Sequence, residues 1–218
     1  MTININLKKN GCYGEILKLQ ENIINGINVT ENIEKGIYKY SKDQFHFSVI
    51  NFENYKKGGV PIDKFKELNY HHIAKINSLL QKFDGYTISD KTVQSGYIYT
   101  GCNLQSIAIQ VFPSIQLCQL FDDICYQMNK GTELGLAKIK DNRYNRFAVN
   151  IVRFFRELTF NEKESISRSI DDFNITCENN RKIGEKIFFE FEIEYISFVV
   201  SDNWLSNQYP EQSFIKLA

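Results

Sequence analysis

Two segments of the sequence, 45–52 and 147–154, share one arrangement of apolar and polar residues. They read FHFSVINF and FAVNIVRF, and they align without gaps at a separation of 102 residues (148 − 46). Each segment alternates apolar and polar side chains between phenylalanines, which is typical of a strand with one packed face and one accessible face. The repetition predicts a duplicated fold with a single site between its two halves.

The accessible positions of the two segments carry different side chains. His46 and Ser48 occupy them in the first segment, and Ala148 and Asn150 occupy them in the second. Strand side chains repeat every two residues, so each pair points to one face of its strand. A lone strand histidine is most often bonded to a backbone carbonyl, but the matching second segment favours a role for His46 in a site.

The size and the charge of the chain limit its organisation and its partners. Its 218 residues, of which 43% are hydrophobic, can build a sizeable core, and we expect a single bilobal domain over 1–218. Lys plus Arg and Asp plus Glu both number 26, so the formal net charge is zero. Such a chain has no general attraction for duplex nucleic acid, whereas a small anionic ligand needs only a few well-placed donors.

The sequence also argues against a membrane partner and against export. The longest apolar runs span only a few residues, far below the roughly 20 residues of a membrane-spanning helix. The N-terminus lacks the order of regions found in a signal peptide, so we expect a cytoplasmic protein. An odd number of cysteines without a C-x-x-C pair indicates reduced, buried thiols rather than metal ligands. They are Cys12, Cys102, Cys118, Cys125 and Cys177.

Hydrophobic periodicity predicts a mixed order of helices and strands. The predicted helices, in which apolar residues repeat at three and four positions, are 14–24, 61–83, 114–129 and 162–173. The predicted strands are 2–7, 37–52, 86–100, 104–112, 147–154 and 187–200. The break at 101–103 predicts a hairpin. Glu190, Glu192 and Glu194 alternate with apolar residues in the last strand, which indicates a solvent-exposed row rather than a metal site.

Four-residue stretches inside the two matching segments resemble the motifs of the two-histidine (2H) phosphoesterase superfamily, which has the LigT-like fold. This superfamily includes RNA 2′,3′-cyclic phosphodiesterases and 2′-5′ oligonucleotide phosphodiesterases, and its pattern is two H-x-S/T-x tetrads. Residues 46–49 (HFSV) match the first tetrad, and 148–151 (AVNI) occupy the second with both defining positions changed. Arg153, two residues beyond the second tetrad, and the closing segment 196–202 also fit the family pattern.

The resemblance implies a fold and a reaction. The fold is α+β, a pseudo-twofold bilobal arrangement in which two mainly antiparallel sheets face a central cleft and helices pack outside. The reaction is cleavage of a 2′,3′-cyclic, 2′-5′ linked or cyclic oligonucleotide by metal-independent acid and base catalysis from two histidines. Hydroxyls two residues along each strand bind the phosphate oxygens, and neither a metal ion nor another cofactor is required.

The changed second tetrad affects turnover more than binding. His46 can transfer a proton and Ser48 can bind a phosphate oxygen, whereas Ala148 can do neither. A general acid or base contributes about 10² to 10⁴ in rate, so the loss of one slows the reaction strongly. The amide of Asn150 can still donate a hydrogen bond to phosphate. We therefore expect a phosphodiesterase that is impaired at its second catalytic position.

Two explanations of Ala148 stay open. An engineered form could carry alanine in place of histidine to trap an uncleaved ligand, and the retained flanking residues of the segment slightly favour this explanation. A natural protein could instead bind a nucleotide, or sequester a cyclic oligonucleotide, without cutting it, and Asn150 favours this alternative. A purely structural module is a third class, and it would tolerate the loss of His46 and Ser48.

Aromatic and basic side chains are candidates for contacts with a small nucleotide or a short oligonucleotide. Tyr97, Tyr99, Trp204 and Tyr209 could stack on a base, which is worth about 1 to 3 kcal/mol per base. Core packing explains the two strand tyrosines, Tyr97 and Tyr99, equally well. Arg153 could contact phosphate or form a structural ion pair, and the sequence favours neither. The base, the linkage and the oligomeric state are not predicted.

Overall fold

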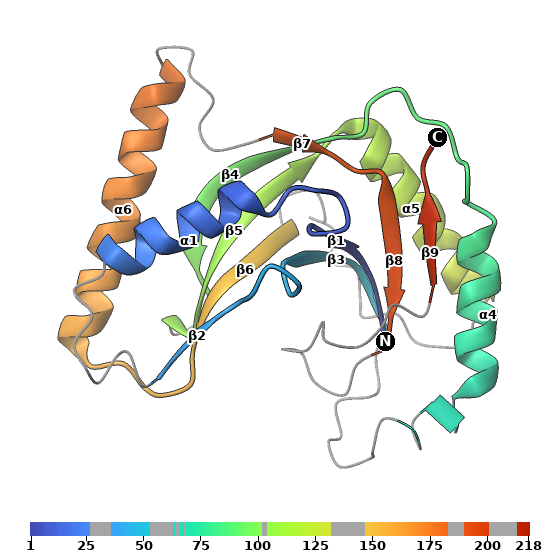
Figure 1. The fold of residues 1–218 in the computed structure, drawn as a ribbon, viewed down its shortest axis with the longest axis horizontal. Helices are drawn as coiled ribbons and strands as arrows, with labels where there is room; N and C mark the ends of the chain where they lie inside the picture. Colours follow the sequence, from blue (N-terminus) through green and yellow to red (C-terminus); the bar gives the residue numbers. More distant parts are fainter. Residues whose placement is uncertain are drawn as a thin grey trace.

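The computed structural model describes residues 1–26, 36–52, 63, 66–67, 69–101, 104–131, 147–182, 190–200 and 213–218. The helices are interspersed among single strands and runs of two or three strands (Figure 1). The strands are β1 (Thr2–Asn6), β2 (Ile37–Lys39), β3 (His46–Asn51), β4 (Thr92–Thr100), β5 (Ser106–Pro113), β6 (Phe147–Phe154), β7 (Glu190–Glu192), β8 (Tyr195–Val199) and β9 (Ser213–Lys216). The helices are α1 (Gly14–Gly26), α4 (Tyr70–Gln81), α5 (Ile115–Gly131) and α6 (Phe160–Lys182).

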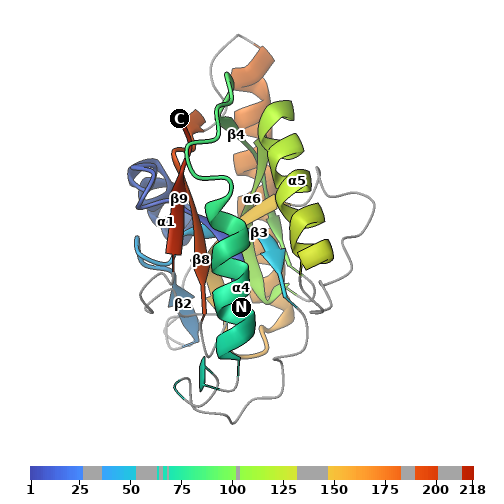
Figure 2. The same ribbon diagram turned by 90° about the vertical axis from the view of Figure 1, so that its right-hand side faces the viewer.

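The strands form two antiparallel sheets. Sheet A has the strand order β3-β1-β8-β9, and sheet B has the order β2-β6-β5-β4-β7. Helix α4 contacts β9 of sheet A and helix α6 contacts β4 of sheet B, so these helices flank the molecule at opposite ends (Figure 1). Figure 2 shows α4 next to α5, which it contacts. The predicted α+β class, with two antiparallel sheets and helices outside them, is confirmed, and the arrangement is consistent with a LigT-like fold.

One face of sheet A is apolar and packs into the core. In the register of the sheet, Ile5 pairs with Phe47, and Ile3 pairs with Phe198. All four of these side chains are fully buried. Burial of a large apolar side chain stabilises the fold by about 1.5 to 3 kcal/mol, so this face holds sheet A on the core.

Strands β3 and β6 lie side by side although they belong to different sheets. Their Cα atoms approach within 8 Å, closer than the roughly 10 Å that separates two sheets stacked face to face. An aromatic cluster lies on one side of this pair. The ring centroid of Phe47 is 5.5 Å from that of Phe147, and the Phe121 ring of α5 lies 6.4 Å and 5.6 Å from these two rings. This cluster joins the two sheets at the predicted repeat.

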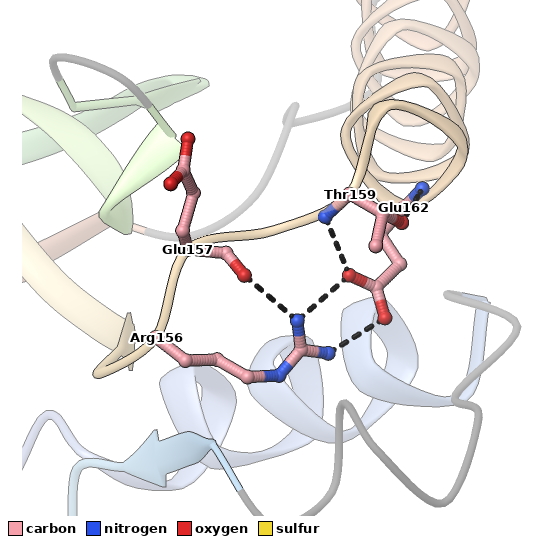
Figure 3. Close-up of polar contacts among 4 residues, drawn as sticks. All are labelled: Arg156, Glu157, Thr159 and Glu162. Atoms are coloured by element: carbon pink, nitrogen blue, oxygen red, sulfur yellow. Dashed lines mark hydrogen bonds and ion pairs between the residues drawn. The ribbon is translucent and has the colours of Figure 1, made fainter.

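A half-buried ion pair fixes the connection from β6 to α6 (Figure 3). The Arg156 guanidinium donates to both carboxylate oxygens of Glu162, at 2.8 Å and 2.6 Å, and to the Glu157 carbonyl at 2.9 Å. Glu162 also accepts a hydrogen bond from the Thr159 N–H at 2.8 Å, and its own N–H donates to the Thr159 hydroxyl at 3.3 Å. This reciprocal pair is a capping box, which starts α6. A side chain at Gly36 would lie 2.7 Å from Arg156 Cγ, so glycine there makes room for the arginine.

The predicted strand 187–200 is wrong as a single element. The structure has β7 in sheet B and β8 in sheet A, and the chain passes between the sheets at residues 193–194. The side chain of Asn10 holds this break, because its Oδ1 accepts hydrogen bonds from the N–H groups of Glu194 and Tyr195 at 2.7 Å and 2.9 Å. Alternation continues through the break, so the sequence pattern could not reveal it.

The predicted strand 37–52 is divided in the same way. Strand β2 lies in sheet B, β3 lies in sheet A, and a turn at 42–44 separates them. In this turn the Gln44 side-chain carbonyl accepts a hydrogen bond from the Ser41 N–H at 2.8 Å. The predicted hairpin of 86–100 and 104–112 is present as β4 and β5, although β4 begins only at Thr92.

Two predicted helices differ in length from the structure. Helix α4 begins at Tyr70, and the part of the predicted segment 61–83 before residue 69 is described at only three positions. Helix α6 runs to Lys182, well beyond the predicted end at 173. Asn174 extends its contact with the sheet, because its side chain accepts from the Ile98 N–H at 3.0 Å and donates to the Ile98 carbonyl at 2.8 Å. A polar anchor of this kind leaves no apolar period in the sequence.

Burial agrees with the predictions for the glutamate row and for two cysteines, whereas Cys12, also predicted to be buried, is only partly buried. Cys118 and Cys125 are buried in α5, and burial raises the pKa of the Cys118 thiol to about 11. The three alternating glutamates of 190–194 are all exposed. Within the described residues, no helix combines the length and the apolar character needed to cross a membrane.

Candidate functional site

The two repeated strands present their polar positions on one common face. Phe47 and Phe147 both point into the aromatic cluster under α5. Because side chains alternate along a strand, positions 46 and 48 of β3 and positions 148 and 150 of β6 point away from that cluster. His46, Ser48 and Ala148 are partly accessible, and Asn150 is exposed. We call this surface of β3 and β6 the paired-strand face.

His46 has a defined tautomer. Its Nδ1 lies 2.8 Å from the carbonyl oxygen of Gln44. A carbonyl only accepts hydrogen bonds, so neutral His46 carries its proton on Nδ1 and a lone pair on Nε2. Burial lowers the pKa of His46 below its ordinary value of 6.5, and the hydrogen bond to Gln44 opposes this shift. At neutral pH the imidazole is therefore uncharged and can accept a proton at Nε2.

Two asparagines of β1 that the predicted motifs do not include lie beside the paired-strand face, with Asn6 partly accessible and Asn4 fully buried. Asn4 is the cross-strand neighbour of Ser48, and Asn6 is the neighbour of His46. Neighbours in register point to the same face of a sheet, so both amides lie on the side of His46 and Ser48. The strict alternation of Ile3, Asn4, Ile5 and Asn6 in the sequence indicates this placement. The isoleucines must face the core, so the asparagines face the other side of the strand.

The second half of the face has alanine where the family pattern has histidine and an amide where it has a hydroxyl. Gln110 of β5 is the cross-strand neighbour of Ala148, and Ala108 is the neighbour of Asn150. A glutamine amide donates and accepts hydrogen bonds but does not titrate near neutral pH, so Gln110 cannot replace a catalytic histidine. The side chains at positions 110 and 150 can contribute to binding a phosphate, not to transferring a proton.

The strand tyrosines are not core residues. Tyr97 and Tyr99 of β4 are 37% and 40% exposed, so the core-packing explanation is wrong for both. Tyr99 pairs with Ala108, which pairs with Asn150, so these three residues form one row across β4, β5 and β6. Neighbours in register share a face of the sheet, so the tyrosine ring lies on the same side as Asn150. Tyr99 is thus placed to contact a ligand that reaches Asn150.

Arg153 has a structural contact. It is partly buried near the end of β6, beside Tyr38 of β2. Its guanidinium hydrogen-bonds the Tyr40 side chain. Burial raises the pKa of Tyr40, and this hydrogen bond opposes the rise. This contact is a hydrogen bond to a tyrosine, whereas the structural role considered from the sequence was an ion pair, and a contact with phosphate stays a prediction.

Two of the predicted aromatic contacts, Trp204 and Tyr209, lie outside the described residues. In the part of the chain that the structure describes, no group of three or more His, Cys, Asp or Glu side chains is placed to hold a metal ion. The described groups on the paired-strand face are an imidazole, a hydroxyl and several amides. These groups suit hydrogen bonding to an anion and proton transfer by a single histidine.

Comparison with known proteins gives one structural likeness to report. No protein-family model matches the chain, and no curated protein matches it. Among solved structures, the chain is similar to Kluyveromyces marxianus Usb1, with 11% sequence identity and a TM-score of 0.41. The match covers 84% of this chain and 87% of that chain. A likeness at this level does not establish a common family, so a function has to be argued from the paired-strand face itself.

Proposed function

We propose that the paired-strand face binds a phosphodiester group of a small nucleotide or short oligonucleotide, as in a 2H-type phosphodiesterase. One observation carries the proposal. Strands β3 and β6 lie side by side, and their aromatic cluster directs His46 and Ser48 to the same side as Ala148 and Asn150. The two halves of the sequence repeat therefore meet at one site, as the resemblance to that superfamily implies.

Each group on the face has a role in this proposal. His46 accepts a proton at Nε2, since its Nδ1–H is held by the Gln44 carbonyl and its pKa is lowered by burial. The Ser48 hydroxyl and the Asn150 amide donate hydrogen bonds to phosphate oxygens. A base stacks on the exposed ring of Tyr99, in the same row as Asn150.

Ala148 limits the reaction that this chain can perform. Cleavage of a phosphodiester needs one group to remove a proton from the attacking oxygen and another to protonate the leaving oxygen. Only His46 can take one of these roles on the described face, because Gln110 and Asn150 do not titrate near neutral pH. We expect turnover about 10² to 10⁴ slower than with a second histidine, and a smaller effect on affinity.

Non-catalytic binding is the second candidate function. Both defining positions of the second tetrad are changed, to Ala148 and Asn150, while the strand itself is intact. A protein that sequesters a nucleotide signal needs the binding groups of this face but not a second proton-transfer group. This candidate predicts stoichiometric binding without product, with or without a histidine at position 148.

Titration calorimetry with chromatography of the recovered ligand tests both candidates. The panel contains a 2′,3′-cyclic mononucleotide, a 2′-5′ linked dinucleotide and cyclic di- and trinucleotides. The variants are Ala148→His, His46→Ala and Ser48→Ala, with Ser78→Ala, an exposed position of α4, as the matched control.

Each outcome assigns a different function. Binding that is weakened by Ser48→Ala, together with cleavage that appears in Ala148→His and is lost on adding His46→Ala, supports the phosphodiesterase. Binding without cleavage in any variant supports sequestration. An unaltered chain that binds no member of the panel contradicts both candidates and favours a structural module.

A further inference from the structure

Asn4 is a buried amide without a hydrogen-bond partner in the described part of the chain. Its side chain is fully buried in the middle of sheet A. Neither its Oδ1 nor its Nδ2 has a hydrogen-bond partner among the described residues. An amide buried in this way costs free energy, so native proteins seldom keep one without a reason.

The other buried polar side chains of the described chain are all engaged. Gln20 donates to the Tyr40 carbonyl at 3.0 Å, and Gln44 accepts from the Ser41 N–H at 2.8 Å. Glu162 pairs with an arginine, and Ser197 also has an interaction. Asn4 is therefore an exception in a fold that otherwise satisfies its buried polar groups.

The place of Asn4 in the sheet connects it with the proposed site. It pairs with Ser48 of β3 on one side and with Ser197 of β8 on the other. Cross-strand neighbours have Cβ atoms about 4.5 to 5.5 Å apart, and polar pairs in such positions hydrogen-bond readily. A side-chain amide and a hydroxyl on such neighbouring positions are within reach of a hydrogen bond.

We propose that Asn4 is a positioning residue for phosphate binding by Ser48. This inference rests on the function proposed above. When the ligand binds, the Asn4 N–H donates to Ser48 Oγ, so the hydroxyl directs its own hydrogen outward to a phosphate oxygen. Without the amide, the Ser48 hydroxyl rotates between several acceptors and loses part of its preference for the ligand.

The proposal predicts opposite effects of one substitution on stability and on binding. Leucine has the shape of asparagine without its polar atoms, so Asn4→Leu should raise the melting temperature. The same variant should weaken binding of adenosine 2′,3′-cyclic phosphate about tenfold, which corresponds to one lost hydrogen bond. Asn4→Thr keeps a hydroxyl that can reach Ser48, and it should bind within about twofold of the unaltered chain.

Asn6→Leu is the matched control, because Asn6 lies two residues along the same strand on the same face. Its Oδ1 accepts from the Lys9 N–H at 3.0 Å, and its Nδ2 donates to the Asp43 carbonyl at 3.4 Å. Loss of these bonds should lower the melting temperature. A higher melting temperature for Asn4→Leu and a lower one for Asn6→Leu would show that the Asn4 amide costs stability, whereas the Asn6 amide contributes to it.

A double-mutant cycle with Ser48→Ala tests the positioning role itself. We expect Asn4→Leu to weaken binding no further once Ser48 is absent, because the amide acts only through that hydroxyl. Unchanged affinity in Asn4→Leu, or additive losses in the cycle, would overturn this inference and leave the proposed function standing. If neither Asn4→Leu nor Asn4→Val folds, Asn4 supports the fold rather than the ligand, and the inference is wrong. An unaltered chain that does not bind the cyclic phosphate overturns the proposed function and this inference together.

Discussion

Replacement of Glu162 by glutamine should lower the melting temperature by about 4 to 8 °C. The Glu162 carboxylate is nearly buried, with 10% of its side chain exposed, and it accepts two hydrogen bonds from Arg156 and one from the Thr159 N–H. Glutamine cannot keep the bidentate, charge-assisted pair, and it leaves the guanidinium without its counter-charge. Charge-assisted hydrogen bonds of this kind are worth about 2 kcal/mol, and each kcal/mol shifts the melting temperature of a chain of this size by about 2 to 4 °C.

The effect should also depend on pH. The Arg156 guanidinium, with help from Thr159, lowers the pKa of Glu162 from 4.5 to about 2. A carboxyl whose pKa is lower in the folded state stabilises the fold fully above pH 4.5, and this stabilisation is lost as the pH falls from 4.5 towards 2. The difference between the unaltered chain and Glu162→Gln should therefore be smaller at pH 3 than at pH 7.

Differential scanning calorimetry at both pH values measures the two effects. Glu164→Gln is the matched control, because Glu164 pairs with Arg168 in an exposed contact on the same helix, and exposed pairs of this kind contribute little. Equal losses in Glu162→Gln and Glu164→Gln, or a loss for Glu162→Gln that does not change between pH 7 and pH 3, would refute the reasoning.

Three further predictions concern the paired-strand face and the aromatic cluster on the other side of its strands. In the Ala148→His variant, the acidic limb of the pH–rate profile should have its midpoint below pH 6.5, because the base must be neutral and burial lowers the pKa of His46. A midpoint above pH 6.5 would exclude His46 as the base. Tyr99→Leu should weaken nucleotide binding by about 1 to 3 kcal/mol in calorimetry, whereas Tyr126→Leu, at an exposed position of α5, should not. Phe47→Ala should lower the free energy of unfolding in urea by about 3 to 5 kcal/mol, and a loss below 1 kcal/mol would contradict the aromatic joint between the sheets.

The sequence was most informative where a strand has one packed face and one accessible face. The predicted strand 147–154 has the bounds of β6, and its matching segment contains β3. Alternation in these segments also predicted which side chains share a face, because the apolar members must enter the core. Nothing in either pattern shows that the two strands lie side by side, since that depends on long-range packing between the rings of Phe47 and Phe147.

The predicted bounds are wrong where a single polar side chain hydrogen-bonds to backbone groups of another segment. Asn10 holds the crossing between β7 and β8, and Asn174 anchors the second half of α6 to β4. Neither contact leaves a period in the sequence, so the last strand was predicted too long and the helix too short. The sequence did not single out Asn4, because its importance depends on the hydrogen-bond partners that it lacks among the described residues and not on its position in the alternating pattern.

A crystal structure of the chain with a bound 2′,3′-cyclic nucleotide would test the central claim most directly. The proposal predicts the phosphate between β3 and β6, with its oxygens about 3 Å from Ser48 Oγ and from the Asn150 amide. A nucleotide bound elsewhere, such as in the depression lined by Ser89, Gln116 and Asp123, would contradict it. Crystals grown at saturating nucleotide that show no ligand on the paired-strand face would contradict it as well.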